Sequence, residues 1–344
     1  MTDAVIRGIS IYLPEGTLTN EDLGAQYPDW EIDKLAAKNG ISSRHIVGED
    51  QTGLDLAEEA CRELFREGVT APDGTSAGPI EPDSIDALLY CTQTADYLMP
   101  TNACLLQDRL GLPTTTMAFD FNLGCSGWVY GLSMAKGLIA TGQAKRIILV
   151  TTEVYSRWIN DDDRSIRTLF GDGACATLIE AGDADMPGGH INDAVYGTDG
   201  AGAANIIVTG AGMNGAPLDD RSANRGEGPT MFMDGPEVFA FTLAAVPKMM
   251  QQLYEKSGKD VDSIDQFILH QANRYMLEHL RRKLRIPKEK FILEIADVGN
   301  TVSSTIPIAL GRAYRDGRVQ AGQTLALVGF GVGFSWGGVL VDWR

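Results

Sequence analysis

Three polar residues stand where apolar runs end, and together they could form a nucleophilic site: Cys125, His270 and Asn300. Cys125 follows the strand-like run MAFDFNL and precedes the helix-like run SGWVYGLSMAKGLIA. Free N–H groups and the positive dipole end at a helix N-terminus stabilise a thiolate, so we expect a lowered thiol pKa and a reactive sulfur. The local sequence by itself favours the plainer alternative, a buried and inert cysteine, which is the usual state of a free thiol.

His270 and Asn300 occupy positions that suit hydrogen bonding to a reacting group. His270 ends the apolar run FIL, and the C-terminal end of a strand is where open α/β sheets bind ligands. Asn300 follows Gly299 at the position that corresponds to Cys125 in an internal repeat. The alternative is that the three polar residues are unrelated. Their positions at the ends of strand-like runs in both halves favour a shared catalytic site instead.

The internal repeat is the strongest signal of organisation in the chain. Three segments of the first half resemble three of the second, in the same order and at a nearly constant offset. The pairs are 82–95 with 261–274, 117–142 with 291–317, and 146–153 with 324–331. Chance recurrence of apolar strands would give scattered offsets, so we infer a duplicated fold with halves 1–182 and 183–344. If a pseudo-twofold axis relates the halves, Cys125 and Asn300 face one cleft.

Short apolar runs alternate with helical segments in each half of the chain. The segments 53–67 and 236–256 have the apolar spacing of helices, whereas runs such as RIILVTTE are typical of buried strands. This alternation predicts a layered α/β fold rather than a sandwich or a bundle.

Composition narrows the function classes. The chain has 344 residues and a net charge of -17, which argues against nucleic-acid binding. It contains no apolar stretch long enough to span a membrane and begins without a secretory signal, so we expect no membrane insertion. Five cysteines without a C-x-x-C pair, and four histidines without ligand spacing, predict no metal site and a cytoplasmic setting.

Two further segments allow more than one interpretation. GFGVGFSWGG (329–338) is either a tight strand connection or a set of backbone amides close to a reacting centre. HLRRKLRIPKEK (279–290) is either a solvated helix end or a docking patch for an anionic partner.

With these motifs assembled, the chain resembles the ketoacyl-acyl carrier protein synthase III family of thiolase-like condensing enzymes over almost its whole length. The matching segments besides the Cys125 junction are GISIYLPEGTLTNEDL, GISSRHI (40–46), FGDGA (170–174), HQAN (270–273), GNT (299–301) and the glycine-dense terminus. The resemblance implies a duplicated thiolase-like five-layered αβαβα fold and a homodimer.

The resemblance also implies a reaction. Cys125 would take an acyl group from a thioester, and His270 and Asn300 would bind the carbonyl of a malonyl thioester on acyl carrier protein. Loss of CO2 would give a carbanion that attacks the acyl group and forms a β-ketoacyl product. Phe330 matches a phenylalanine beside the catalytic pair, and the amides of Cys125 and of the turn containing Val332 and Gly333 would form an oxyanion hole. No cofactor is implied, since coenzyme A and malonyl thioesters enter as substrates.

Binding positions depart from the family pattern. The residues implied for coenzyme A or pantetheine are Trp30, Lys34, Lys38, Arg164, Phe239 and Asn273. The family resemblance implies that a tryptophan and an arginine four residues later hold the adenine of coenzyme A. Here Lys34 stands four residues after Trp30, and counting back from Gly40 puts Lys38 in the arginine position. The donor is therefore either acyl-coenzyme A or an acyl carrier. Met99, reaching across the dimer, and Tyr155 match acyl-pocket positions. The residues implied for carrier docking are Arg274, with Tyr275 in the usual slot, and Arg281, Arg282 and Lys283.

Three other functions are compatible with parts of the pattern. A non-decarboxylating acyltransferase would use the same acyl-cysteine. A cysteine hydrolase would share the order of Cys125, His270 and Asn300, although the sequence LGCSGW lacks the papain-like signature. A non-catalytic carrier-binding subunit would have no use for the complete set of three.

Overall fold

Two copies of one strand arrangement lie side by side in the computed structural model, which describes residues 2–68, 78–214, 216–222 and 228–344. Within this part of the chain, ten strands form a continuous sheet in the order β12-β11-β13-β14-β8-β1-β7-β6-β4-β5. The strands of the first copy are β1 (Asp3–Tyr12), β4 (Ala87–Cys91), β5 (Met117–Phe121), β6 (Arg146–Glu153) and β7 (Gly173–Gly182). Those of the second are β8 (Gly189–Thr198), β11 (Gln266–Leu269), β12 (Phe291–Ile292), β13 (Thr324–Gly331) and β14 (Ser335–Trp343).

The order and direction of the strands repeat between the copies. β4 pairs in parallel with β5 and β6, as β11 does with β12 and β13. β7 is antiparallel to β6 and β1, as β14 is to β13 and β8. The three sequence pairs fall on β4 and β11, β5 and β12, and β6 and β13, so the predicted duplication of the fold is confirmed.

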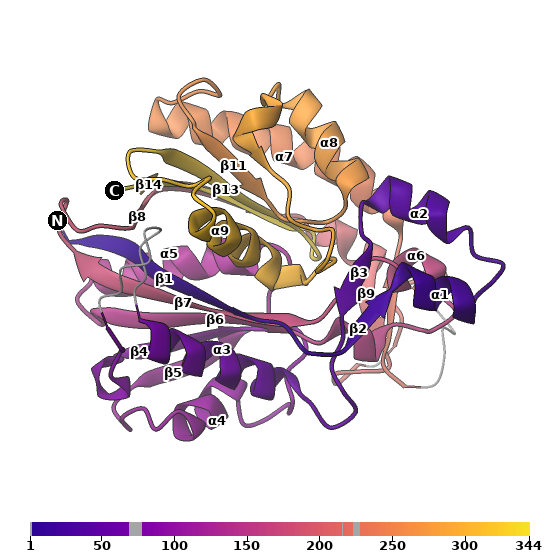
Figure 1. Ribbon diagram of the computed structural model, residues 1–344, viewed down its shortest axis with the longest axis horizontal. Coiled ribbons are helices and arrows are strands. Elements are labelled where there is room, and N and C mark those ends of the chain that lie inside the picture. Colours follow the sequence, from indigo (N-terminus) through magenta and orange to yellow (C-terminus); the bar gives the residue numbers. More distant parts are fainter. Residues whose placement is uncertain (1, 69–77, 215, 223–227) are drawn as a thin grey trace.

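Helices form three layers around the two copies of the sheet (Figure 1). α3 (Gly53–Glu67) and α4 (Asn102–Arg109) cover the outer face of the first copy, and α7 (Gly235–Ser257) and α8 (Arg274–Lys283) cover that of the second. α5 (Gly127–Ala140) and α9 (Thr305–Arg315) lie between the copies, and α5 contacts strands of both. The helices predicted at 53–67 and 236–256 are present as α3 and α7.

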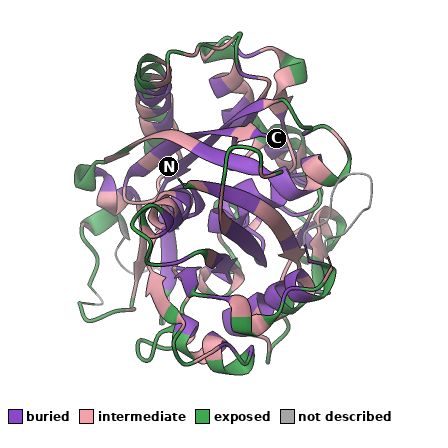
Figure 2. Cartoon of the chain, turned by 90° about the vertical axis from the view of Figure 1, so that its left-hand side faces the viewer, coloured by how far each residue is buried: buried purple, intermediate pink, exposed green. Residues whose placement is uncertain are grey.

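Buried residues are concentrated in the strands and on the helix faces that pack against them (Figure 2). Gly131 of α5 explains the close packing there, because a Cβ at this position would lie 2.6 Å from Cδ1 of Leu149 on β6. One continuous core joins Trp128, Leu149 and Ile306 with apolar residues of both copies. Burial of this size fixes where α5 begins, and therefore where Cys125 lies.

Smaller elements gather at one end of the sheet (Figure 1). They are the ribbons β2 (Thr17–Thr19) with β3 (Ser43–His45) and β9 (Ile206–Thr209) with β10 (Thr230–Met233), and the helices α1 (Asn20–Gln26), α2 (Ile32–Asn39) and α6 (Arg164–Arg167). Among the helices that the structure describes, none combines the length and apolar character needed to cross a membrane.

Candidate active site

Cys125 lies in the turn between β5 and α5, and its side chain is almost enclosed, with 8% of the residue exposed. The end of β13 passes directly against it. A Cβ on Gly331 would lie 2.7 Å from the Cys125 Sγ atom, and the φ angle of Gly331 is 157°, so this position requires glycine. The segment 329–338 therefore brings backbone close to the Cys125 sulfur, as expected if its backbone amides lie close to a reacting centre.

Burial, not the helix end, sets the acidity of the thiol. The backbone amides of Val332 and of Cys125 itself favour the thiolate, but desolvation raises the pKa of Cys125 to about 12. The expectation of a lowered pKa is therefore wrong, because the sulfur is enclosed and no positive charge among the described residues offsets the loss of water. The resting nucleophile is a neutral thiol.

His270 follows β11 and is also enclosed, with 2% of the residue exposed. Its Nδ1 atom lies 2.7 Å from Oγ1 of Thr305, the first residue of α9. Phe330 packs edge-on against the imidazole, with ring centroids 5.5 Å apart and planes at 82°. Desolvation lowers the pKa of His270 to about 3, so the ring is neutral at pH 7.

Asn300 is held by the backbone of both halves of the chain. Its N–H donates to the Leu169 carbonyl over 2.8 Å, and its carbonyl accepts from the Gly171 N–H over 3.1 Å. The side-chain Oδ1 accepts from the Val302 N–H over 2.9 Å. Because that bond occupies the amide oxygen, the Nδ2 group is the part of the carboxamide left to donate to a ligand.

One cavity of about 850 Å³ brings the three residues together. Cys125, His270, Asn300 and Phe330 line its inner part, and Lys38, Phe239, Asn273 and Tyr275 also line it. Lys38 places its Nζ atom 5.0 Å from the centre of the Tyr275 ring, and Phe239 packs on the same ring at 5.5 Å. The convergence predicted from the repeat is present, although the role of each residue stays a prediction.

Two predicted binding residues do not reach this cavity. Trp30 precedes α2 and stacks on Tyr27, with centroids 4.1 Å apart, and Lys34 is paired with Glu31. Both line a separate surface hollow. Neither residue lines the Cys125 cavity, because Trp30 lies about two helical turns from Lys38, the residue of this segment that does line it. Their contact with coenzyme A stays a prediction.

The other predicted binding residues have mixed positions. Arg164 is exposed at the start of α6, beside Ser165, which lines the cavity. Tyr155 is buried, packs on Phe170 at 5.2 Å and donates to Oε1 of Gln93 over 2.5 Å. It belongs to the same apolar cluster as Cys125 but does not line the cavity.

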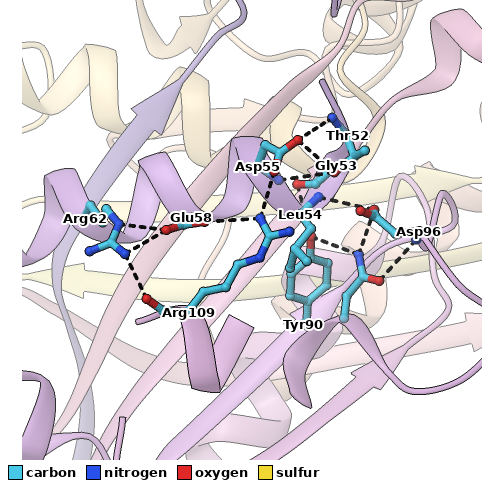
Figure 3. A network of polar contacts seen from close by, with 10 residues as sticks. Thr52, Gly53, Leu54, Asp55, Glu58, Arg62, Tyr90, Asp96 and Arg109 are labelled. Carbon is cyan, nitrogen blue, oxygen red and sulfur yellow. Dashed lines mark hydrogen bonds and ion pairs between the residues drawn. The ribbon is translucent and has the colours of Figure 1, made fainter. Parts of the chain in front are cut away.

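Met99 lies in the connection between β4 and α4 and is 83% exposed, with Leu98 exposed beside it. Polar contacts fix the base of this segment (Figure 3). Asp96 accepts from the Leu54 N–H and from Nδ2 of Asn102, both over 3.2 Å. Exposed apolar side chains on an anchored segment are typical of contact surfaces.

The basic segment predicted for docking lies on α8 and beyond. Arg274 packs against the backbone of Gly40, and Arg281 pairs with Glu278 over 2.9 Å. Arg282 and Lys283 are exposed. The segment is therefore in part structural, and its exposed cations are the part available to a partner.

Sequence reasoning missed three residues of the site. Glu153 is the last residue of β6 and is fully buried near Cys125. A carboxylate at the end of the apolar run RIILVTTE is a sequence signal that could have indicated this residue. Thr305 contacts His270, and Arg221 lines the cavity while donating to Asp234 over 3.0 Å. Neither carries a sequence signal. In the described ranges, no group of three or more His, Cys, Asp or Glu side chains could hold a metal ion.

A duplicated α/β sheet with a cysteine, a histidine and an asparagine on one cavity defines a condensing enzyme of the thiolase-like class. The family models "3-Oxoacyl-[acyl-carrier-protein (ACP)] synthase III" and its C-terminal part match residues 119–212 and 254–343. A curated relative, beta-ketoacyl-[acyl-carrier-protein] synthase III of Methylococcus capsulatus, is 34% identical over 345 residues, 98% of each chain. The chain belongs to the 3-oxoacyl-[acyl-carrier-protein] synthase III family.

Solved structures agree with this assignment. A 3-oxoacyl-(acyl-carrier-protein) synthase III structure is 44% identical with a TM-score of 0.89, and covers 99% of this chain and 100% of its own. A 3-oxoacyl-(acyl-carrier protein) synthase from Burkholderia xenovorans is 34% identical with a TM-score of 0.88, over 99% and 94%. The chain is thus a transferase of the condensing type, and the hydrolase alternative does not fit its fold.

Proposed function

We propose that Cys125, His270 and Asn300 carry out the two half-reactions of a ketosynthase on thioester substrates. An acyl group is first loaded on Cys125 and is then condensed with a malonyl thioester as CO2 leaves. The observation that supports this proposal is the single cavity on which the three side chains meet.

The loading step uses the thiol and the backbone around it. Cys125 Sγ attacks the thioester carbonyl, and negative charge develops on the carbonyl oxygen. The amides of Cys125 and Val332, which already act on the sulfur, are the donors for that oxygen. Gly331 and Gly333 have positive φ angles, 157° and 138°, which shape the backbone turn that presents the Val332 amide.

The condensation step uses the second half of the chain. The malonyl carbonyl lies against His270 and Asn300, and Nδ2 of Asn300 donates to the enolate oxygen as the carboxylate leaves as CO2. The carbanion then attacks the Cys125 acyl carbon, the bond from that carbon to Sγ breaks, and the released thiolate takes a proton from solvent to restore the thiol. Phe330 limits the space beside His270. An amide donor stabilises the enolate without adding a second titrating acid.

Substrates enter from the end of the cavity that contains Lys38, Phe239, Asn273 and Tyr275. This mixture of apolar rings, an amide and an ammonium suits a pantetheine arm, with coenzyme A or a carrier protein outside. The cations implied for carrier docking are Arg274, Arg281, Arg282 and Lys283. They support an anionic carrier, but they leave open whether the primer arrives on coenzyme A or on the carrier.

We also propose a homodimer in which the segment around Met99 packs on a second copy. The support is the exposure of Met99 and its neighbour Leu98 on an anchored segment. Thioesters serve as substrates and no cofactor is proposed. A cytoplasmic setting stays a prediction, consistent with the free thiols of all five cysteines.

Intact-protein mass spectrometry tests the loading step. The chain is incubated with a panel of acyl-coenzyme A and acyl-carrier donors, alongside the Cys125→Ala variant. We expect an acyl adduct on the wild type and none on the variant. An adduct that persists in the variant shows that Cys125 is not the attachment site, and no adduct with any donor favours a non-catalytic subunit.

Release of CO2 from a malonyl thioester tests the second step. The condensation predicts one CO2 per β-ketoacyl product formed. Transfer of the acyl group to an alcohol or amine without CO2 release would instead support the non-decarboxylating acyltransferase.

A further inference from the structure

Three of the segments that carry the family resemblance meet around one buried side chain. They are GISSRHI (40–46), FGDGA (170–174) and GNT (299–301). Arg44 of the first segment is fully enclosed, with 0% of the residue exposed. A Cβ on Gly171 would lie 3.1 Å from the Cβ of Arg44, and a Cβ on Gly299 would lie 3.2 Å from it. The Arg44 side chain therefore begins between the two segments that flank Asn300.

The guanidinium of Arg44 is held by neutral oxygens. Its Nη1 donates to the Leu18 carbonyl over 3.0 Å, and its Nη2 donates to the Thr168 carbonyl and to Oδ1 of Asn20, both over 2.9 Å. No carboxylate among the described residues pairs with it, and burial together with the charge of Arg167 lowers the pKa of Arg44 to about 10. The group is therefore charged at pH 7, although burying an unpaired charge is unfavourable.

The Thr168 carbonyl connects Arg44 with Asn300. Thr168 precedes Leu169, and the Leu169 carbonyl accepts from the Asn300 N–H over 2.8 Å. Two consecutive carbonyls therefore have different donors, the Arg44 guanidinium and the Asn300 backbone. The next residue, Phe170, pairs with Asn300 in a parallel bridge. The position of Asn300 thus depends on where Arg44 holds this segment.

The shape of the guanidinium suits this task. Its N–H groups point in fixed directions in one plane, so a single side chain can fix the positions of several oxygens relative to one another. Thr168 and Asn300 line the Cys125 cavity, whereas Arg44 does not. Any effect of Arg44 on the reaction must therefore pass through the residues that it holds.

We propose that Arg44 is a positioning residue that fixes the segment 168–171 against Asn300, so that Nδ2 of Asn300 lies where the enolate oxygen forms. This inference rests on the proposed function and refines it, because it concerns the condensation half-reaction. Loading uses the turn between β5 and α5 and the end of β13, and none of the hydrogen bonds of Arg44 goes to these segments. A donor displaced by about 1 Å loses much of its effect on a developing charge.

A double-mutant cycle in the full chain tests the connection between Arg44 and Asn300. Arg44→Met keeps an apolar side chain of comparable length and removes the donors. Release of labelled CO2 from malonyl-coenzyme A is measured with and without Asn300→Ala. We expect Arg44→Met to slow this release by about tenfold to 10²-fold in the wild-type background. In the Asn300→Ala background the same change should cost less than about twofold, because the group through which Arg44 acts is gone.

Equal losses in the two backgrounds would overturn the proposal, since they would show that Arg44 does not act through Asn300. Arg7→Met is the matched control, because Arg7 is a partly buried arginine that donates to Glu180 over 3.1 Å on the β1–β7 pair. It should change CO2 release by less than about twofold in either background.

Arg44→Lys separates geometry from charge. Lysine keeps a positive charge but lacks the planar set of donors, so we expect CO2 release to fall by at least about threefold, again only when Asn300 is present. Full activity of this variant would overturn the proposal. The cycle with Arg44→Lys decides the question if Arg44→Met does not fold.

Acyl loading distinguishes this inference from the proposed function. In Arg44→Met, loading of Cys125 from acyl-coenzyme A should stay within about threefold of wild type. The kcat for CO2 release should fall while the KM for malonyl-coenzyme A stays within about threefold. Equal losses in loading and in CO2 release would refute the role of Arg44. Failure of the wild type to release CO2 would instead refute the proposed function.

Discussion

The Ser303 hydroxyl donates to Oε1 of Glu153 over 2.9 Å, and this bond joins the two halves of the chain behind the active site. Glu153 also accepts from the Gln93 N–H over 3.1 Å. No residue that the structure describes forms an ion pair with Glu153, and its side chain is fully buried. A carboxyl group in this setting favours its neutral form.

Glu153→Gln should stabilise the protein at neutral and alkaline pH. Burial raises the pKa of Glu153 from 4.5 to about 8. The native state therefore holds a proton that the unfolded chain loses above pH 4.5, and stability declines as the pH rises from 4.5 to 8, by at most about 5 kcal/mol. The glutamine keeps an oxygen for the Gln93 N–H and removes this decline.

Urea unfolding at pH 5, 7 and 8.5 measures this effect. The difference between Glu153→Gln and wild type should grow with pH, whereas the exposed Glu289→Gln should show no such trend. A variant that is less stable than wild type at pH 8.5 would contradict a buried neutral carboxyl.

Alkylation of Cys125 should be slow at neutral pH and should accelerate with base. Burial raises the pKa of this thiol to about 12, and the thiolate is the reactive form. In a Cys104→Ser background, which removes the exposed thiol, the iodoacetamide rate should rise about tenfold per pH unit from 7 to 10. A plateau below pH 8 would show that the protein lowers the pKa of this thiol instead.

Asn300→Asp should separate the two half-reactions. Aspartate keeps an oxygen for the Val302 N–H but has no N–H for the enolate oxygen. We expect CO2 release from a malonyl thioester to fall by about 10²–10³, with acyl loading of Cys125 within a few fold of wild type. Mass spectrometry and CO2 capture give the two rates. Parallel losses in both would remove Asn300 from a specific role in decarboxylation.

Gly331→Ala should impair loading while the fold persists. The new Cβ would lie 2.7 Å from Sγ of Cys125, so the sulfur or the β13 end must shift. Gly317→Ala is the control, because Gly317 also has a positive φ but its Cβ would meet open space. We expect kcat/KM to fall at least about tenfold for the first variant and to be unchanged for the second. Similar activity of the two variants would mean that contact with the sulfur is unimportant.

The repeat in the sequence determined the main lines of the fold. Matching runs around Cys125 and Asn300 predicted two copies of one strand order, because apolar periodicity is a local property that survives duplication. The same symmetry placed both residues on one cavity, and the HQAN motif placed His270 beside them. The helices at 53–67 and 236–256 followed from spacing by itself.

The acidity of Cys125 was decided by tertiary structure. A helix end close to the thiol is visible in the sequence, but desolvation depends on how completely distant segments cover it, and here that cover outweighs the helix. Tertiary structure also decided the distance of Trp30 from the cavity, because this distance depends on where α2 begins. Glu153 and Thr305 contact residues of the site region that are more than thirty positions away in the chain, Ser303 and His270. Contacts of that kind depend on how the layers pack against one another, and the order of residues in the sequence does not specify that packing.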